Sequence, residues 1–88
     1  MKLLSIKPSG TKAVLLEIKK AAGIELIRVP YTDIVNVSKL TTKKKKLPVA
    51  KFQFRSSKVY PSGGSDVLNL DIDKDAIEEF EEFLYYMD

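Results

Sequence analysis

The sequence predicts a mainly β domain of six or seven short strands, closed by one C-terminal amphipathic helix. Up to residue 72, apolar and polar side chains alternate in short runs, which is the period of half-buried strands. Gly- and Pro-containing turns separate these runs. After residue 73 the period changes to three and four residues, as on one face of a helix. With 88 residues, the chain has room for one core, so residues 1–88 are expected to form one domain.

The first three strands are expected within residues 3–29. An apolar run at 3–7 stops at the sequence PSG, where Gly10 allows a positive φ. Residues 14–18 then alternate between apolar and polar, and KAAG turns the chain into a partner strand at 24–29. Because this connection is so short, the two strands are expected to form an antiparallel hairpin.

The sequence VPYTD interrupts the strands, because Pro30 cannot donate a hydrogen bond to a ladder. Thr32 or Asp33 is able to cap a single helical turn at this point. A fourth strand follows, in which Val35 and Val37 are expected to face one way and the polar residues beside them the other.

The remaining strands lie on either side of a loop. Residues 50–54 alternate so that two phenylalanines point into the core and a basic stripe is left outside. Residues 56–66 are rich in Ser, Gly and Pro and predict a loop, which can hold a short edge strand around Val59 and Tyr60. Residues 68–72 alternate again and predict the last strand.

The C-terminal helix is expected at about residues 74–87, with Asp73 as its N-cap. Its carboxylates repel one another, so packing of the apolar face must hold the helix in place. That face consists of Ala76, Ile77, Phe80, Phe83, Leu84 and Met87.

Composition excludes several classes of chemistry. The chain has no cysteine and no histidine, which removes disulfides, thiolate zinc sites, cysteine nucleophiles and histidine bases together. No Gly-rich phosphate-binding motif is complete. We therefore expect a protein that is not an enzyme and that needs no cofactor and no metal. No signal-peptide pattern or long apolar run is present, so we expect a cytoplasmic, at most membrane-peripheral, protein.

Charge is distributed unevenly along the chain. Residues 1–62 contain fourteen lysines and arginines against three carboxylates, whereas residues 63–88 contain one lysine against nine carboxylates. This asymmetry predicts either a body that attracts acidic partners, or two surfaces that attract each other within one fold.

Four consecutive lysines precede the fifth predicted strand. Adjacent ammonium groups repel one another, so the interpretation we favour is a solvated connection between strands. The alternative is a surface for nucleic acid or anionic lipid, with weak and sequence-tolerant binding. That candidate anion-binding surface comprises Lys39, Lys43, Lys44, Lys45, Lys46, Lys51, Arg55 and Lys58.

The acidic segment DIDKDAIEEFEE superficially has the spacing of a calcium loop. However, Ala76 occupies the sixth position, where such a loop needs Gly for a sharp turn, and the apolar helical face begins inside the segment. A capped acidic helix is the better interpretation. Its candidate acidic surface comprises Asp75, Glu78, Glu79, Glu81 and Glu82.

Three stretches resemble small bacterial pleckstrin-homology-like (PH-like) domains: VPYTDIVNV at 29–37, FQF at 52–54 and AIEEFEEFLYYM at 76–87. They are similar to that family's strand, Pro-Tyr turn and next strand, and then to its later strand and closing helix. The resemblance implies an antiparallel PH-like barrel or sandwich whose helix plugs one open end. It also implies a binding or scaffolding module without chemistry of its own.

The same resemblance implies several binding surfaces. Phosphoinositide-binding members carry basic residues around the first hairpin loop. Here Lys7 and Lys12 bracket that loop, but Val14 stands where the final arginine would be. Other members take a partner peptide in the groove between the last helix and a neighbouring strand, or by adding a strand to an exposed edge.

Three hypotheses about function follow. The first is a non-catalytic module that acts through protein–protein contacts. The second is an electrostatic binder of nucleic acid or an anionic membrane through the basic region at 43–58. The third is a small phage-type inhibitor whose acidic helix occupies a partner's basic site. An exposed edge strand would also allow a homodimer.

Overall fold

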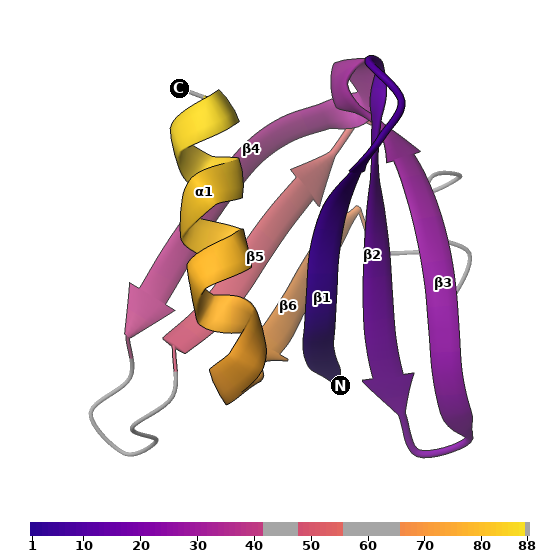
Figure 1. Ribbon diagram of the computed structural model, residues 1–88, viewed down its shortest axis with the longest axis vertical. Coiled ribbons are helices and arrows are strands. Elements are labelled where there is room, and N and C mark those ends of the chain that lie inside the picture. Colours follow the sequence, from indigo (N-terminus) through magenta and orange to yellow (C-terminus); the bar gives the residue numbers. More distant parts are fainter. Residues whose placement is uncertain (42–47, 56–65, 88) are drawn as a thin grey trace.

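The computed structural model describes residues 1–41, 48–55 and 66–87 (Figure 1). It confirms a mainly β architecture with one C-terminal α-helix. The elements are β1 (Lys2–Ser9), β2 (Ala13–Lys20), β3 (Gly23–Pro30), the 3-10 turn η1 (Tyr31–Asp33), β4 (Ile34–Thr41), β5 (Pro48–Phe54), β6 (Val67–Ile72), the 3-10 turn η2 (Lys74–Ala76) and α1 (Ile77–Met87).

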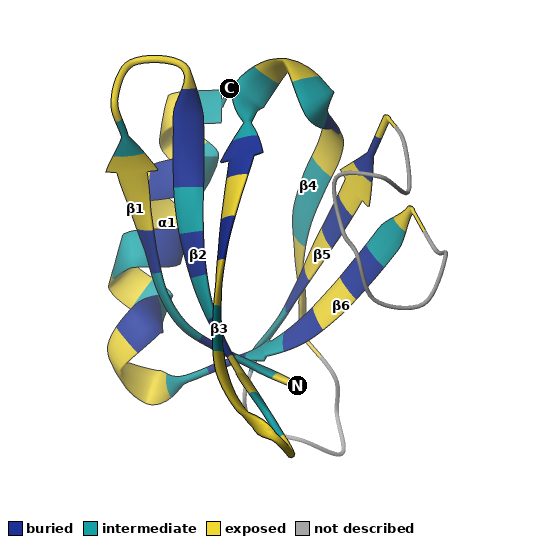
Figure 2. Ribbon diagram, turned by 90° about the vertical axis from the view of Figure 1, so that its right-hand side faces the viewer, coloured by how far each residue is buried: buried dark blue, intermediate teal, exposed yellow. Residues whose placement is uncertain are grey.

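The six strands form one sheet in the order β3-β2-β1-β6-β5-β4. The first three strands and the last three each form an antiparallel meander. The meanders meet at a corner, where the start of β1 runs parallel to the end of β6 with Lys2 opposite Asp71 and Leu3 opposite Ile72 (Figure 2). The sheet is therefore mixed, with one short parallel joint.

The sheet is not closed into a barrel, so the barrel form of the expected architecture is wrong. β3 and β4 are the two ends of the sheet and do not pair with each other in the described residues. The η1 turn connects these two edge strands, and its two ends are hydrogen-bonded to different meanders. The Tyr31 amide donates to the Lys12 carbonyl at 2.9 Å, while the Arg55 amide donates to the Asp33 carbonyl at 2.7 Å.

The strands extend one or two residues beyond most of the expected segments, and β4 departs from the expected alternation. A β-bulge between Ile34 and Asn36 shifts the register against β5. As a result Val35 is 59% exposed, whereas Val37 packs against the core. A bulge adds one unpaired residue, which reverses the side-chain alternation on one side of it. The edge strand expected around Val59 and Tyr60 lies outside the described residues.

The helical turns follow the predicted positions, with one difference in capping. The Asp73 carboxylate accepts a hydrogen bond from the Asp75 amide at 3.3 Å, which confirms it as the N-cap of the C-terminal helical segment. In contrast, η1 has Pro30 at its N-cap position and no side-chain cap. Thr32 and Asp33 lie inside the turn, so neither caps it. None of the described helices is long and apolar enough to cross a membrane.

The core lies between the concave face of the sheet and α1. Phe52 and Phe54 of β5 are buried as predicted, and their rings stack at 6.0 Å. Phe80 and Phe83 of α1 meet Phe52 at centroid distances of 5.9 and 6.2 Å. The predicted apolar face of the helix is thus confirmed as the buried one, and Ile77, Leu84 and Met87 pack at its margins.

We predict that Phe80→Ala lowers the free energy of unfolding by about 3–5 kcal/mol, because Phe80 is fully buried and its removal leaves a cavity. Urea unfolding measures this change. The control is Tyr85→Ala, which removes a ring that is 86% exposed on the same helix and is expected to change stability by less than about 0.5 kcal/mol. Equal losses in the two variants would contradict the position of α1.

Candidate functional site

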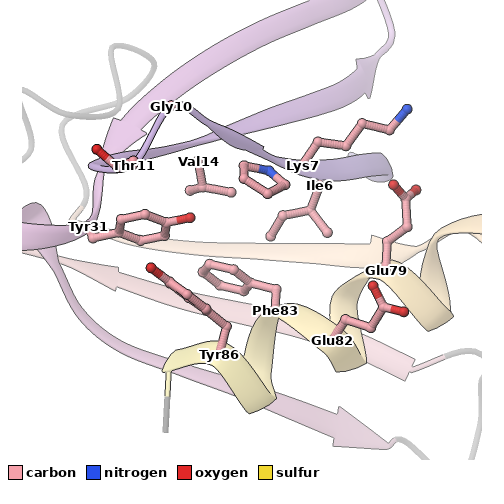
Figure 3. A pocket seen from close by; sticks show the side chains of 11 residues that line it. Ile6, Lys7, Gly10, Thr11, Val14, Tyr31, Glu79, Glu82, Phe83 and Tyr86 are labelled. Atoms are coloured by element: carbon pink, nitrogen blue, oxygen red, sulfur yellow. The ribbon is translucent and has the colours of Figure 1, made fainter.

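A pocket of about 460 Å³ lies between the β1–β2 turn, η1 and α1 (Figure 3). Three segments that are far apart in the sequence thus contribute to one concave surface. Most of its lining is aliphatic or aromatic, which is usual for a ligand-binding pocket. The residues that line it are Ile6, Lys7, Pro8, Gly10, Thr11, Val14, Tyr31, Glu79, Glu82, Phe83 and Tyr86.

The β1–β2 turn forms one wall of the pocket. β1 carries Ile6 and Pro8 toward the pocket before the chain reverses at Gly10, which has a φ of +70°. This left-handed conformation is strained for residues with a side chain, so glycine suits the turn. The backbone hydrogen bond from Tyr31 to Lys12 then fixes η1 against this turn. The wall is therefore part of the fold and does not depend on a bound partner.

Three aromatic rings form the adjoining side of the pocket. Tyr31 stacks on Phe83 with ring centroids 6.3 Å apart and meets Tyr86 at 5.4 Å. Phe83 is only 7% exposed and belongs to the core, whereas Tyr86 is 65% exposed. The exposure of the pocket wall thus increases along these rings from the hydrophobic core to the surface. An apolar group inserted into the pocket would contact aromatic rings on one side.

Charged groups lie at one end of the pocket and hydroxyl groups at the other. Figure 3 shows Lys7, Glu79 and Glu82 at one end, while the hydroxyl groups of Tyr31 and Tyr86 lie toward the opposite end. Two carboxylates against one ammonium group give this rim a net negative charge. Such a rim favours a ligand that carries a positive group beside an apolar one.

Burial raises the pKa of the Tyr31 phenol above its ordinary value of 10.0, and the neighbouring Tyr86 phenol raises it further when charged. The cause is mainly desolvation, which disfavours the phenolate. Tyr31 is therefore a neutral hydrogen-bonding group at physiological pH.

The described members of the candidate anion-binding surface do not lie on one face. Lys39 is opposite the fully buried Ala50 and so lies on the helix side of the sheet, where its ammonium group bonds to a Glu81 carboxylate oxygen at 2.6 Å. Lys51 is the next residue along β5 and points to the opposite face. Arg55 follows the end of β5, beside η1. The other predicted members, Lys43, Lys44, Lys45, Lys46 and Lys58, lie outside the described residues.

The members of the candidate acidic surface lie on different sides of the helical segment. Glu79 and Glu82 line the pocket, and Glu81 pairs with Lys39 on another side of α1. Asp75 and Glu78 are exposed at the start of the helical segment. No group of metal-ligating side chains gathers within the described ranges.

The sequence indicated this pocket only in part: the resemblance implied a groove beside the last helix, and Glu79 and Glu82 were candidate site residues, but the aromatic wall was not predicted. Tyr31 belongs to a motif that was singled out, but its role as a pocket wall depends on contact with α1. Tyr86 lies outside the apolar helical stripe, and nothing in its position predicts a partner ring from η1. The segments that approach the helix, near Pro8 and Gly10, carried only a turn signal.

A second, smaller concavity runs between β4 and α1. It has a volume of about 330 Å³ and is lined by Val35, Asn36, Val37, Ser38, Leu84 and Met87. Grooves thus flank the helix on two sides, of which the one beside β1 is larger and more aromatic.

Comparisons of the chain with protein-family models, with curated proteins and with solved structures gave no match. The functional argument therefore depends on the geometry of the pocket. Its polar groups are carboxylates, an ammonium group and hydroxyls around an aromatic surface, a combination suited to selecting a ligand by shape and charge.

We predict that stability falls in alkali partly because of Tyr31. Its folded-state pKa is raised, so its stabilising effect is complete below the unfolded pKa near 10 and is lost as the pH rises through the folded pKa. Urea unfolding from pH 8 to about pH 11 should therefore show a smaller alkaline loss for Tyr31→Phe than for wild type. Tyr85→Phe is the matched control. An identical alkaline loss in wild type and Tyr31→Phe would contradict this assignment.

We predict a small coupling between Lys39 and Glu81, because their side chains are 34% and 53% exposed. A double-mutant cycle with Lys39→Ala and Glu81→Ala should give about 0.2–1 kcal/mol, declining as salt is added. A coupling above about 2 kcal/mol would show instead that this pair is desolvated and anchors the helix.

Proposed function

We propose that the protein is a non-catalytic interaction module of the PH-like kind, which binds a peptide segment of a partner protein in the pocket between α1, η1 and the β1–β2 turn. The observation that carries this proposal is an aromatic, largely apolar pocket with two carboxylates at its rim. The succession of short strands and a packed C-terminal helix supports the PH-like assignment, although the sheet is open.

The chemistry of the pocket defines the peptide. An aromatic or long aliphatic side chain would lie against Phe83 and Tyr86, and a lysine or arginine beside it would face Glu79 and Glu82. Tyr31 would offer a neutral hydroxyl to the peptide backbone. Hydrophobic anchors of this kind supply most of the energy in peptide recognition, while charges at the rim set specificity and the rate of association.

The electrostatic alternative receives less support from the described residues. One of its members, Lys39, is already paired with Glu81, and Lys51 lies on the other face of the sheet. A polyanion would therefore have to bind without Lys39.

The test begins with selection of short random peptides displayed on phage. Wild-type protein is the target. The Glu79→Gln/Glu82→Gln double variant is used to remove peptides whose binding does not depend on the two rim carboxylates. We expect the selected peptides to carry a basic residue near an aromatic or long aliphatic one. In an NMR amide titration, they should shift the resonances of Gly10, Tyr31 and Phe83.

Two neighbouring tyrosines provide matched variants. Tyr86→Ala should weaken binding of a selected peptide about tenfold or more, equivalent to about 1.4 kcal/mol, because Tyr86 lines the pocket. Tyr85→Ala should leave the affinity unchanged, since Tyr85 does not line the pocket. Equal effects of the two substitutions would contradict the proposed site.

Duplex DNA and vesicles containing an anionic phospholipid are titrated in parallel at low and near-physiological salt. Binding that persists near physiological salt, with shifts on β5 and none at the pocket, would overturn the proposal in favour of the electrostatic function. Shifts that disappear with added salt would support the peptide-binding proposal, because they indicate only long-range attraction of the nucleic acid or lipid.

A further inference from the structure

β3 is an open edge of the sheet. Its outer side has no strand neighbour in the described part of the chain, so one row of its backbone hydrogen-bonding groups is unpaired there. Ile24 and Leu26 of this strand are 63% and 61% exposed. An edge strand with exposed apolar side chains is a template for pairing with another strand.

The charged side chains of β3 are turned away from this edge. Glu25 forms a salt bridge with Lys20 of β2. Arg28 reaches back across β2, and its Nε donates to the Ser9 hydroxyl of β1 at 3.2 Å. Neither charge therefore has to be displaced for a second strand to approach.

The opposite edge of the sheet is protected. β4 carries a bulge at Val35 and the inward-pointing Lys39, two features that natural sheets use to prevent edge pairing. α1 also lies alongside β4, with Leu84 and Met87 near Val37. Between Gly23 and Val29, β3 has no bulge. Its own inward-facing charge, Glu25, lies opposite the buried Ile18 and is paired with Lys20 of β2. β4 is thus better protected against pairing with another strand than β3 is, and burial of the core does not require this difference.

We propose that β3 pairs in antiparallel fashion with β3 of a second copy of this chain, forming a symmetric dimer with one continuous sheet. The two-fold axis passes beside Leu26, so that Leu26 lies opposite Leu26 of the second copy. Ile24 then lies opposite Arg28 of the second copy, and Glu25 opposite Ile27 of the second copy. A second copy suits this edge because the identical strands meet through their exposed leucines.

Other pairing registers of the two β3 strands are less favourable. An axis at Glu25 or at Arg28 would place like charges opposite each other, which is destabilising. An axis at Ile27 would bring Pro30 into the new ladder, where it cannot donate a hydrogen bond. An axis at Ile24 would leave little of the strand paired. The Leu26 axis uses residues 23–29 of both copies and avoids these costs.

The test uses single cysteine variants, since the chain has no cysteine of its own. Opposite residues in a hydrogen-bonded antiparallel pair have Cα atoms about 5.5 Å apart, which a disulfide can bridge. Leu26→Cys should therefore form a covalent dimer under mild oxidation. In the matched control Ile24→Cys, the two cysteines would be roughly 13 Å apart along the strands, too far for a disulfide. Circular dichroism verifies that both variants are folded.

Sedimentation equilibrium of the cysteine-free chain measures the association independently. From micromolar to millimolar protein, wild type should change from monomer to dimer. Leu26→Lys should weaken the dimer about tenfold or more, because each dimer loses two facing leucine side chains and gains two facing ammonium groups. A monomer at every concentration, or equal crosslinking of Leu26→Cys and Ile24→Cys, would overturn the proposal. Neither measurement involves the peptide pocket, so this result is independent of the proposed function.

Discussion

The packing of Phe80 and Phe83 on Phe52 is the contact on which the rest of the structure depends. The sheet is open, and in the described residues its two meanders pair with each other through one short parallel joint. α1 bridges them, since it contacts β1 in one meander and Phe52 of β5 in the other. Burial of each aromatic side chain contributes roughly 1.5–3 kcal/mol, which offsets the mutual repulsion of the helix carboxylates.

The candidate site is a consequence of the same packing. Once Phe83 is buried, helical spacing places Glu79, Glu82 and Tyr86 along the adjoining side of α1, where they face the β1–β2 turn. Tyr31 completes the pocket because η1 is tied by its backbone to that turn. Core and pocket thus share Phe83, and a change to this residue would affect folding and binding together.

Ion pairs within the fold neutralise part of the uneven charge along the sequence. Lys39 of the basic half bonds to Glu81, and Lys2 lies 3.7 Å from the carboxylate of Asp73. Both pairs join a strand to the C-terminal segment, as expected for two surfaces that attract each other. Glu79 and Glu82, in contrast, line the pocket. Charge that stabilises the fold and charge available to a ligand therefore lie on different sides of one helix.

Most elements follow from local sequence, because local periods and turn chemistry encode them. The alternation around Phe52, the N-cap at Asp73 and the apolar stripe through Phe80 predicted strands, cap and helix close to where they lie. How these elements are arranged relative to one another depends on tertiary contacts. The bulge at Val35, the open sheet and the meeting of η1 with α1 depend on contacts between distant segments, which no local pattern carries. The pocket is built from such contacts, and so it could be found only once the chain was folded.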